Sequence, residues 1–216
     1  MYPGQSSGSL TIPPYKIGTG FSTWRIFGPG DIDADGRGDV LGIRSDGTLW
    51  LFPGNGFLPL SSGHQIGWGW KNWQMAVLKD PHHEAHVALL GVNPDGLLFL
   101  YRGLGTEFAP PVQVGWGWQG WKLYAGGDLN QDGYPDILSV NPQGILSQYP
   151  GKPDGTFGAR AEIGWGWTNW TLAAGTDLTG DARPDLLGRD TKGNLYFYQG
   201  RPNARFSGAT KIASGW

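Results

Sequence analysis

The stretch Ile66-Gly-Trp-Gly-Trp70-Lys-Asn-Trp73 decides the fold of this chain, because it recurs along the sequence at a nearly constant interval. Similar copies begin at residues 17, 114 and 163, and a truncated fifth copy is Ile212-Ala-Ser-Gly-Trp216. The steps between the copies are 49, 48, 49 and 49 residues. Eleven of the 12 Trp residues lie in these copies, so the high Trp content is a property of the repeat. A fixed period of this length indicates an architecture built from repeated structural units.

Each repeat contains short strand-like segments separated by turns. In the first repeat we expect strands over residues 24–28, 40–44, 48–52 and 64–66. A second aromatic motif keeps the same period, as Tyr2-Pro-Gly4, Phe52-Pro-Gly54, Tyr101-Arg-Gly103, Tyr149-Pro-Gly151 and Tyr198-Gln-Gly200. The turns Asp46-Gly47, Asp95-Gly96, Gln143-Gly144 and Lys192-Gly193 are typical of short hairpins. No segment shows a sustained helical period with helix caps.

A unit of about 40–50 residues with four strands is typical of a β-propeller blade. The sequence therefore predicts a single all-β propeller domain over residues 1–216, with a partial repeat 1–20 and complete repeats 21–69, 70–117, 118–166 and 167–216. An internally duplicated β-sandwich is the alternative, but it does not need the same loop chemistry at every 49th position. Either four blades close with a surplus strand, or the chain belongs to a larger ring completed beyond Trp216 or by self-association. We slightly favour a five-fold arrangement with an incomplete blade.

Composition excludes several classes of protein. The 38 Gly and 16 Pro residues argue against a helical protein, while 39% hydrophobic residues suffice for a core. A formal net charge of −2 gives no indication of a nucleic-acid partner or of an anionic membrane surface. No apolar run approaches the roughly 18 residues that a membrane span needs, so we expect no membrane insertion. The absence of Cys excludes disulfides and thiolate zinc sites. The N-terminus does not resemble a signal peptide, so we expect any export signal to have been removed or never present.

The most specific chemistry lies in the acidic segment Asp31-Ile-Asp33-Ala-Asp35-Gly36-Arg37-Gly38-Asp39. Carboxylates at positions 1, 3, 5 and 9, Gly at position 6 and the backbone carbonyl of Arg37 form the hard-oxygen ligand set that Ca²⁺ prefers. The segment resembles the first part of an EF-hand loop, with Asp at position 9 in place of a more distant Glu. Mg²⁺ suits it less well, because the loop offers too many protein oxygens in too flexible a cage.

The acidic pattern returns in two further repeats. The predicted ligands there are Asp128, Asn130, Asp132, the Tyr134 carbonyl and Asp136 in the third repeat, and Asp177, Thr179, Asp181 and Asp185 in the fourth. The fourth loop is weaker, since Ala182 replaces the Gly. Ten of the 18 acidic residues lie in these three loops, and a bound divalent ion would remove their mutual repulsion. Solvated Asp-rich turns are the alternative.

The second repeat has lost the acidic pattern, because Asp80, His82, Glu84 and Ala88 occupy the equivalent places. His82, His83 and His86 give a His-x-x-x-His spacing that can bind zinc on a helix. No helix is expected in this segment, so we interpret it as a loop that no longer needs a metal, and we predict no site there.

These motifs resemble the FG-GAP/VCBS repeat family, in the form common in secreted actinobacterial proteins. The resemblance lies in Gly-Asp-x-(Asp/Asn)-x-Asp-Gly-x-x-Asp, the following Leu-Leu-(Gly/Ser), Gly-x-Leu-x-x-(Tyr/Phe)-x-Gly and the closing Ile-Gly-x-Gly-Trp, and it covers nearly the whole chain. It implies a β-propeller with Ca²⁺ in the loop between the first two strands of a blade, as in integrin heads and some propeller lectins. It also implies an extracellular domain, often a non-catalytic binding module beside a secreted hydrolase.

The first Trp position of the repeated motif differs from the other two. It holds Trp68, Trp116 and Trp165, but Thr19 and Ser214 in the outer copies, whereas the other positions stay aromatic. We interpret the invariably aromatic positions as packing between blades. The variable position is either a further packing site or a platform for stacking sugar rings.

The favoured function is therefore a secreted, non-catalytic, Ca²⁺-stabilised, lectin-like module that binds a glycan or a cell-surface polysaccharide through repeated shallow sites. The alternative is a protein-interaction or cell-wall targeting module that accompanies a secreted hydrolase. An enzyme is least favoured, because no Ser/His/Asp constellation is visible in the sequence.

Overall fold

The computed structural model describes residues 16–56, 60, 62–80 and 83–216. The chain divides into two compact units, whose described parts lie within residues 16–119 and 120–216. Within the described ranges every regular element is a strand, and no helix long and apolar enough to cross a membrane is present.

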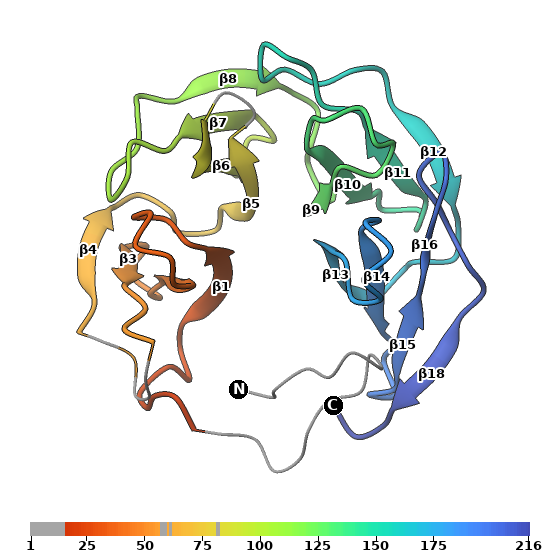
Figure 1. Ribbon diagram of the computed structural model, residues 1–216, viewed down its shortest axis with the longest axis horizontal. Coiled ribbons are helices and arrows are strands. Elements are labelled where there is room, and N and C mark those ends of the chain that lie inside the picture. Colours follow the sequence, from red (N-terminus) through yellow and green to blue (C-terminus); the bar gives the residue numbers. More distant parts are fainter. Residues whose placement is uncertain (1–15, 57–59, 61, 81–82) are drawn as a thin grey trace. The chain divides into compact units, whose positions relative to one another are not determined.

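The first unit contains two antiparallel sheets of four strands each, in simple sequential order (Figure 1). The first blade consists of β1 (Arg25–Gly30), β2 (Asp39–Ile43), β3 (Leu49–Phe52) and β4 (His64–Gly67). The second blade consists of β5 (Gln74–Asp80), β6 (His83–Val92), β7 (Leu98–Arg102) and β8 (Val112–Gly115). One hydrophobic cluster joins the two blades, since it contains Leu41 and Leu49 from the first and Met75 and Leu89 from the second.

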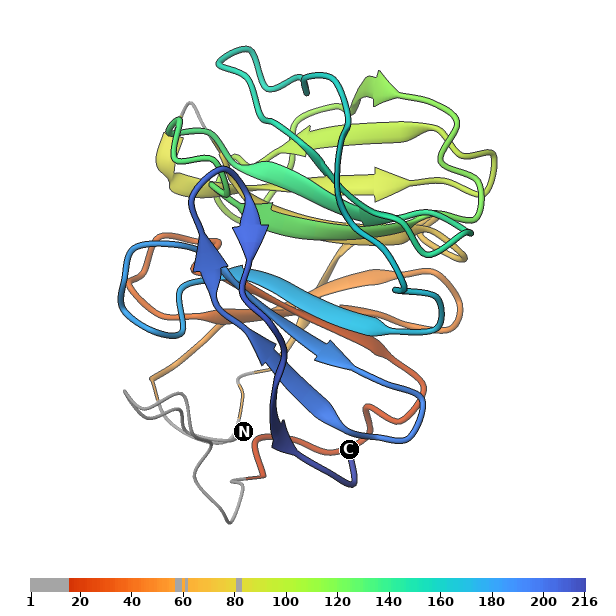
Figure 2. The ribbon, with the colours of Figure 1, turned by 90° about the vertical axis from the view of Figure 1, so that its right-hand side faces the viewer.

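The second unit repeats this arrangement. Its sheets are β9 (Lys122–Gly127), β10 (Asp136–Val140), β11 (Leu146–Tyr149) and β12 (Ala161–Gly164), then β13 (Thr171–Thr176), β14 (Asp185–Arg189), β15 (Leu195–Tyr198) and β18 (Thr210–Ala213). These are the third and fourth blades. A short hairpin of β16 (Gly200–Arg201) and β17 (Arg205–Phe206) is inserted before β18 and is drawn in dark blue in Figure 2.

The predicted fold class is confirmed: the chain is all-β, and its four four-stranded sheets are β-propeller blades. The sheets match the four complete repeats, so four blades fit the described strands better than the five-fold arrangement that we favoured. Most of the partial repeat 1–20 lies outside the described residues, which begin at residue 16. The expected strands of the first repeat agree with β1 to β4 to within one or two residues.

The repeated Gly-Trp-Gly-Trp motif closes each blade by docking on its central hairpin. The second aromatic residue of each copy donates its backbone N–H to the hairpin glycine's carbonyl, in the pairs Trp70–Gly47, Trp118–Gly96, Trp167–Gly144 and Trp216–Gly193 at 2.9–3.1 Å. Gly67 permits close packing, because a Cβ there would lie only 3.2 Å from Nε1 of Trp70. Gly69 is required because its φ is +83°, a conformation that favours glycine.

The third aromatic residue of the motif packs flat against a glycine in the second strand of its blade. A Cβ on Gly42, Gly91 or Gly188 would lie 2.7, 2.9 or 3.0 Å from Cε3 of Trp24, Trp73 or Trp170. The Trp residues and these glycines therefore recur with the same period because each Trp packs against one of the glycines. The third blade differs, because buried Ser139 stands at this position and pairs with buried Ser147 across β10 and β11.

We predict that Gly91→Ala destabilises the protein by about 1–3 kcal/mol, because its Cβ would collide with the rings of Trp70 and Trp73. Urea unfolding followed by Trp fluorescence measures the change. Gly28→Ala is the matched control, since a Cβ at that strand position meets nothing within 4 Å. Equal stability of the two variants would contradict the proposed packing constraint.

Candidate functional site

The three acidic loops occupy one place in the blade topology. They join β1 to β2, β9 to β10 and β13 to β14, so each links the first and second strands of its blade. The described part of the second blade contains no such loop. Strand β5 runs on to Asp80 and strand β6 begins at His83, which pairs with Asp80.

The first loop curls around the carboxylate of Asp31. The backbone N–H groups of Asp35 and Gly36 donate to Asp31 at 3.1 and 2.8 Å. The N–H of Arg37 donates to Asp35 at 2.9 Å, and positive φ angles at Ala34 and Gly36 complete the tight curve. Asp128 in the third blade accepts two N–H bonds with the same spacing. The loops therefore have a defined conformation held by their own carboxylates.

The Asp at position 9 ties each loop to the segment that follows the third strand, at the same end of the sheet. Buried Asp39 accepts the N–H of Ile32 at 2.7 Å with one oxygen and the N–H of Gly54 at 2.7 Å with the other. The same two bonds recur for Asp136 with Leu129 and Gly151, and for Asp185 with Leu178 and Gly200. This aspartate clamp uses the Gly of the second repeated motif in the first, third and fourth blades, since that Gly supplies one donor.

The glycine of the clamp also permits close approach of two backbone segments. A Cβ on Gly54, Gly151 or Gly200 would lie 2.3–2.4 Å from the carbonyl oxygen of the residue before the second strand. Sequence analysis treated Asp39, Asp136 and Asp185 only as metal ligands and missed this structural role. The constant separation of 15 residues between each Asp and its Gly was a signal that could have revealed it.

The first loop brings three of its predicted ligands together. Asp31, Asp33 and Asp39 each place an oxygen within 4.8 Å of the other two. Desolvation raises the pKa of Asp33 above its ordinary value, and the nearby charges of Asp39, Asp35 and Asp31 raise it further, against one N–H bond that lowers it. Each carboxylate oxygen has two lone pairs, so an N–H bond leaves capacity for a metal. This hard-oxygen donor set fits Ca²⁺.

The remaining residues of the first loop differ from the simplest expectation. Asp35 faces the side chain of its neighbour Arg37, whose Nη1 lies 3.3 Å from the Asp35 carboxylate. Arg37, predicted to offer only its carbonyl, therefore also supplies a positive charge at the rim.

The third-blade loop has the same backbone but a different set of side chains. Asn130 donates to Asp132 at 2.7 Å, and Asp132 also accepts the N–H of Tyr134 at 2.9 Å. The Asp136 carboxylate accepts a third bond, from Nε2 of Gln148 at 2.7 Å. Burial raises the pKa of Asp136, and its hydrogen bonds offset that rise in part. Among the residues that the structure describes, the convergence of three carboxylates occurs in the first loop.

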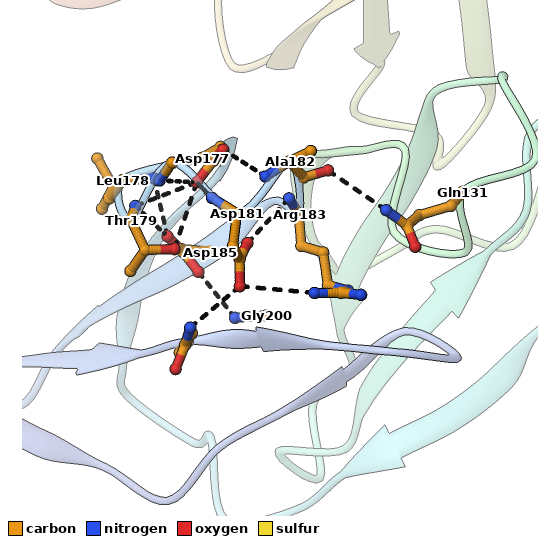
Figure 3. Close-up of polar contacts among 11 residues, drawn as sticks. Gln131, Asp177, Leu178, Thr179, Asp181, Ala182, Arg183, Asp185 and Gly200 are labelled. Carbon is orange, nitrogen blue, oxygen red and sulfur yellow. Dashed lines mark hydrogen bonds and ion pairs between the residues drawn. The ribbon is translucent and has the colours of Figure 1, made fainter.

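The fourth-blade loop is tied down by other side chains of the protein (Figure 3). Asp181 accepts Nε2 of Gln199 at 3.0 Å and lies 3.6 Å from Nη1 of Arg183. Desolvation raises the pKa of Asp177, but N–H bonds from Ala182 and other loop residues outweigh it, so that the pKa lies below its ordinary value. Thr179 stays close to Asp177, with its N–H donating at 3.1 Å. This loop therefore has fewer free carboxylate oxygens than the first.

An arginine stands near the acidic residue that the second blade retains. Buried Asp80 aligns with Asp31 of the first blade, and its carboxylate lies 3.5 Å from Nη1 of Arg102. Arg102 takes the place of Pro53, Pro150 and Gln199 in the other blades. His83 and His86 lie in strand β6, so the helical zinc motif is not formed; His82 lies outside the described residues.

The first Trp of each motif is the exposed one. The exposed fractions of Trp68, Trp116 and Trp165 are 81%, 79% and 87%, and each follows the last strand of a blade. Two residues further on, Trp70 and Trp118 are only 6% and 5% exposed. The expected packing role is confirmed for Trp70, which joins the cluster between the first two blades. The glycines that precede the exposed Trp residues lie against the buried ones, since a Cβ on Gly67, Gly115 or Gly164 would lie 3.1–3.2 Å from Nε1 of the buried or half-buried Trp that follows.

Comparison with known families gives the class of protein. Residues 128–188, which contain the third and fourth acidic loops, match the model of the FG-GAP-like repeat. No curated protein matches the chain. The first blade shares the strand topology and the acidic motif of the matched segment, and the second blade shares its strand topology. The chain is therefore a β-propeller that contains an FG-GAP-like repeat. Its fold supports an interaction module, and FG-GAP repeat propellers are typically not enzymatic.

We predict that Asp136→Ala lowers the free energy of unfolding by about 3 kcal/mol or more, because three donors would lose a buried acceptor. The measurement is urea unfolding in excess chelator, so that no metal contributes. Asp154→Ala is the control, since that carboxylate is exposed and accepts its bonds from Thr156 within a turn. A loss no larger than that of the control would contradict the clamp.

Proposed function

We propose that this protein is a secreted, calcium-stabilised, non-catalytic module that binds a glycan or cell-surface polysaccharide through its exposed Trp residues. The observation that carries the proposal is the exposure of Trp68, Trp116 and Trp165 beside buried aromatic neighbours. Thr19 and Ser214 stand at the same place in other copies of the motif, so the blade does not need an indole there. An exposed indole presents a flat apolar face and a polar N–H, which suit the two sides of a sugar ring.

Repetition suits weak individual sites. A shallow platform of one indole gives low affinity for one sugar, but several platforms engaging one polysaccharide raise the overall affinity. Lys71, Asn72, Gln119, Thr168 and Asn169 lie close to the exposed Trp residues in sequence and carry groups able to bond sugar hydroxyls. Gln119 instead donates to the carbonyl of Asp95 and so helps to hold its turn.

Calcium would stabilise the blades rather than take part in chemistry. The predicted ligands are Asp31, Asp33, Asp35, the Arg37 carbonyl and Asp39 in the first loop, with the corresponding residues of the third and fourth loops. The grouping of Asp31, Asp33 and Asp39 supports the first of these sites most directly. Desolvation and then the neighbouring carboxylates raise the pKa of Asp33, and a cation there would relieve the repulsion among these carboxylates.

A protein-interaction or cell-wall targeting role is the second candidate. It is favoured by other exposed apolar side chains, namely Leu104, Val112, Ile26 and Ile212. We still predict that the protein has no nucleic-acid partner and does not insert into a membrane. Self-association of the chain also stays a prediction.

Replacing the three exposed Trp residues by the residues that occur naturally at this position, as Trp68→Thr, Trp116→Thr and Trp165→Ser together, should abolish binding on a glycan array. Unfolding should shift by no more than about 0.5 kcal/mol, because the side chains are exposed. Leu104→Ala is the control for loss of exposed apolar surface. Undiminished glycan binding by the triple variant would refute the proposal, and binding that no free monosaccharide inhibits would favour a protein partner.

Chelation should lower the melting temperature, because an ion that binds only the folded state stabilises it, by about 2.7 kcal/mol at 100 times its dissociation constant. Differential scanning calorimetry in calcium and in excess chelator measures the effect. The variant Asp31→Asn/Asp33→Asn should lose part of the calcium increment. Identical melting curves in the two buffers would contradict calcium stabilisation while leaving the glycan proposal untouched.

A further inference from the structure

An open groove of about 900 Å³ lies beside Trp68 within the first unit. One wall is β4 of the first blade, including His64 and Gln65, and the other is the segment 106–111 that leads into β8 of the second blade. Trp68 therefore lines a groove that the first and second blades form together.

The lining of this groove combines two kinds of surface. Trp68, Ile66, Phe108 and Pro110 offer apolar area, while His64, Gln65, Thr106 and Glu107 offer hydrogen-bonding groups. Such a mixture suits a ring with one apolar face and a polar edge. Among the described residues that line the groove there is no Lys or Arg, so an incoming anion would meet the carboxylate of Glu107 without a compensating cation.

The wall that holds Glu107 is braced by backbone bonds. The N–H of Leu104 donates to the Glu107 carbonyl at 2.8 Å, and the N–H of Ala109 donates to the Arg102 carbonyl at 2.8 Å. A β-bridge between Gly103 and Phe108 closes the same turn. The backbone that carries Glu107 is therefore fixed before any ligand arrives, which reduces the entropy lost on binding.

Two polar residues of the groove, Glu107 and His64, are not part of the repeat. Phe108 aligns with Phe157 and Phe206, which make the equivalent pairings with Gly151 and Gly200. The residue before this Phe is Glu107 in the second blade but Thr156 and Arg205 in the third and fourth. His64 likewise aligns with Val112 and Ala161. The exposed Trp is repeated, whereas this set of polar groups occurs once.

We infer that this groove is a selective saccharide site, which takes a terminal hexopyranose without an anionic group and excludes uronic and sulfated sugars. Trp68 stacks on the apolar face of the ring, and Glu107, His64 and Gln65 bond its hydroxyls. The inference rests on the proposed glycan-binding function and goes beyond it, because it assigns one groove and the charge of its ligand.

Isothermal titration with methyl glucoside, methyl galactoside, methyl mannoside and methyl glucuronide tests the inference. At least one neutral glycoside should bind at least tenfold more tightly than the glucuronide. Trp68→Thr and Glu107→Gln should each weaken that binding about tenfold, and Glu107→Gln should also reduce the preference over the glucuronide. Glu162→Gln is the matched control, because it removes an exposed carboxylate from the third blade.

Neutral-glycoside binding that survives both Trp68→Thr and Glu107→Gln would overturn the groove assignment. The broader proposal would still stand if the triple Trp variant lost array binding. Equal affinity for the neutral glycosides and the glucuronide would overturn the charge selectivity. If no glycoside bound the protein and no array glycan did, the groove and the proposed function would fail together.

Discussion

The fold of each acidic-loop blade depends on a buried aspartate whose two oxygens join the acidic loop to the segment that follows the third strand, at one end of the sheet. Asp39 joins the start of the acidic loop at Ile32 to the end of β3 at Gly54. A buried carboxylate is costly unless its oxygens are satisfied, and the two N–H donors meet that requirement. The clamp therefore restricts two sequence positions. One must supply the carboxylate of an Asp, and the other must be a Gly because two backbone segments approach closely there.

The four blades handle their acidic residues in different ways. The first loop gathers three carboxylates, which leaves the arrangement best suited to a cation. The third replaces one carboxylate with Asn130, and the fourth holds Asp181 with Arg183 and Gln199. The second blade has exchanged the loop for extended strands and keeps Asp80 near Arg102. The same blade topology therefore accommodates both a loop with three converging carboxylates and a connection that lacks the acidic motif.

Much of the fold was predictable because the repeated residues, Gly and Trp, occur at positions where the backbone conformation or the packing strongly limits the choice of residue. The hairpin glycines and the Trp period predicted the blades. Thr19 and Ser214 stand at the place of Trp68 in other copies, which indicated that this position need not be buried. The aspartate clamp was missed because a carboxylate at loop position 9 also fits a metal. The long β6 falls where the acidic motif is lost, and the hairpin β16–β17 extends a pairing that the second and third blades make as single bridges. The groove escaped prediction because residues 64–68 and 106–111 meet only through the packing of two blades.

Native-state amide hydrogen exchange tests the central role of the clamp most directly. In excess chelator, the amides of Gly54, Gly151 and Gly200 should exchange only with global unfolding, because each donates to a carboxylate held in the core. Replacing Asp136 by Asn should speed exchange at Gly151 while the amides of Gly54 and Gly200 stay protected. Rapid exchange at all three glycines in the unsubstituted protein would contradict the account.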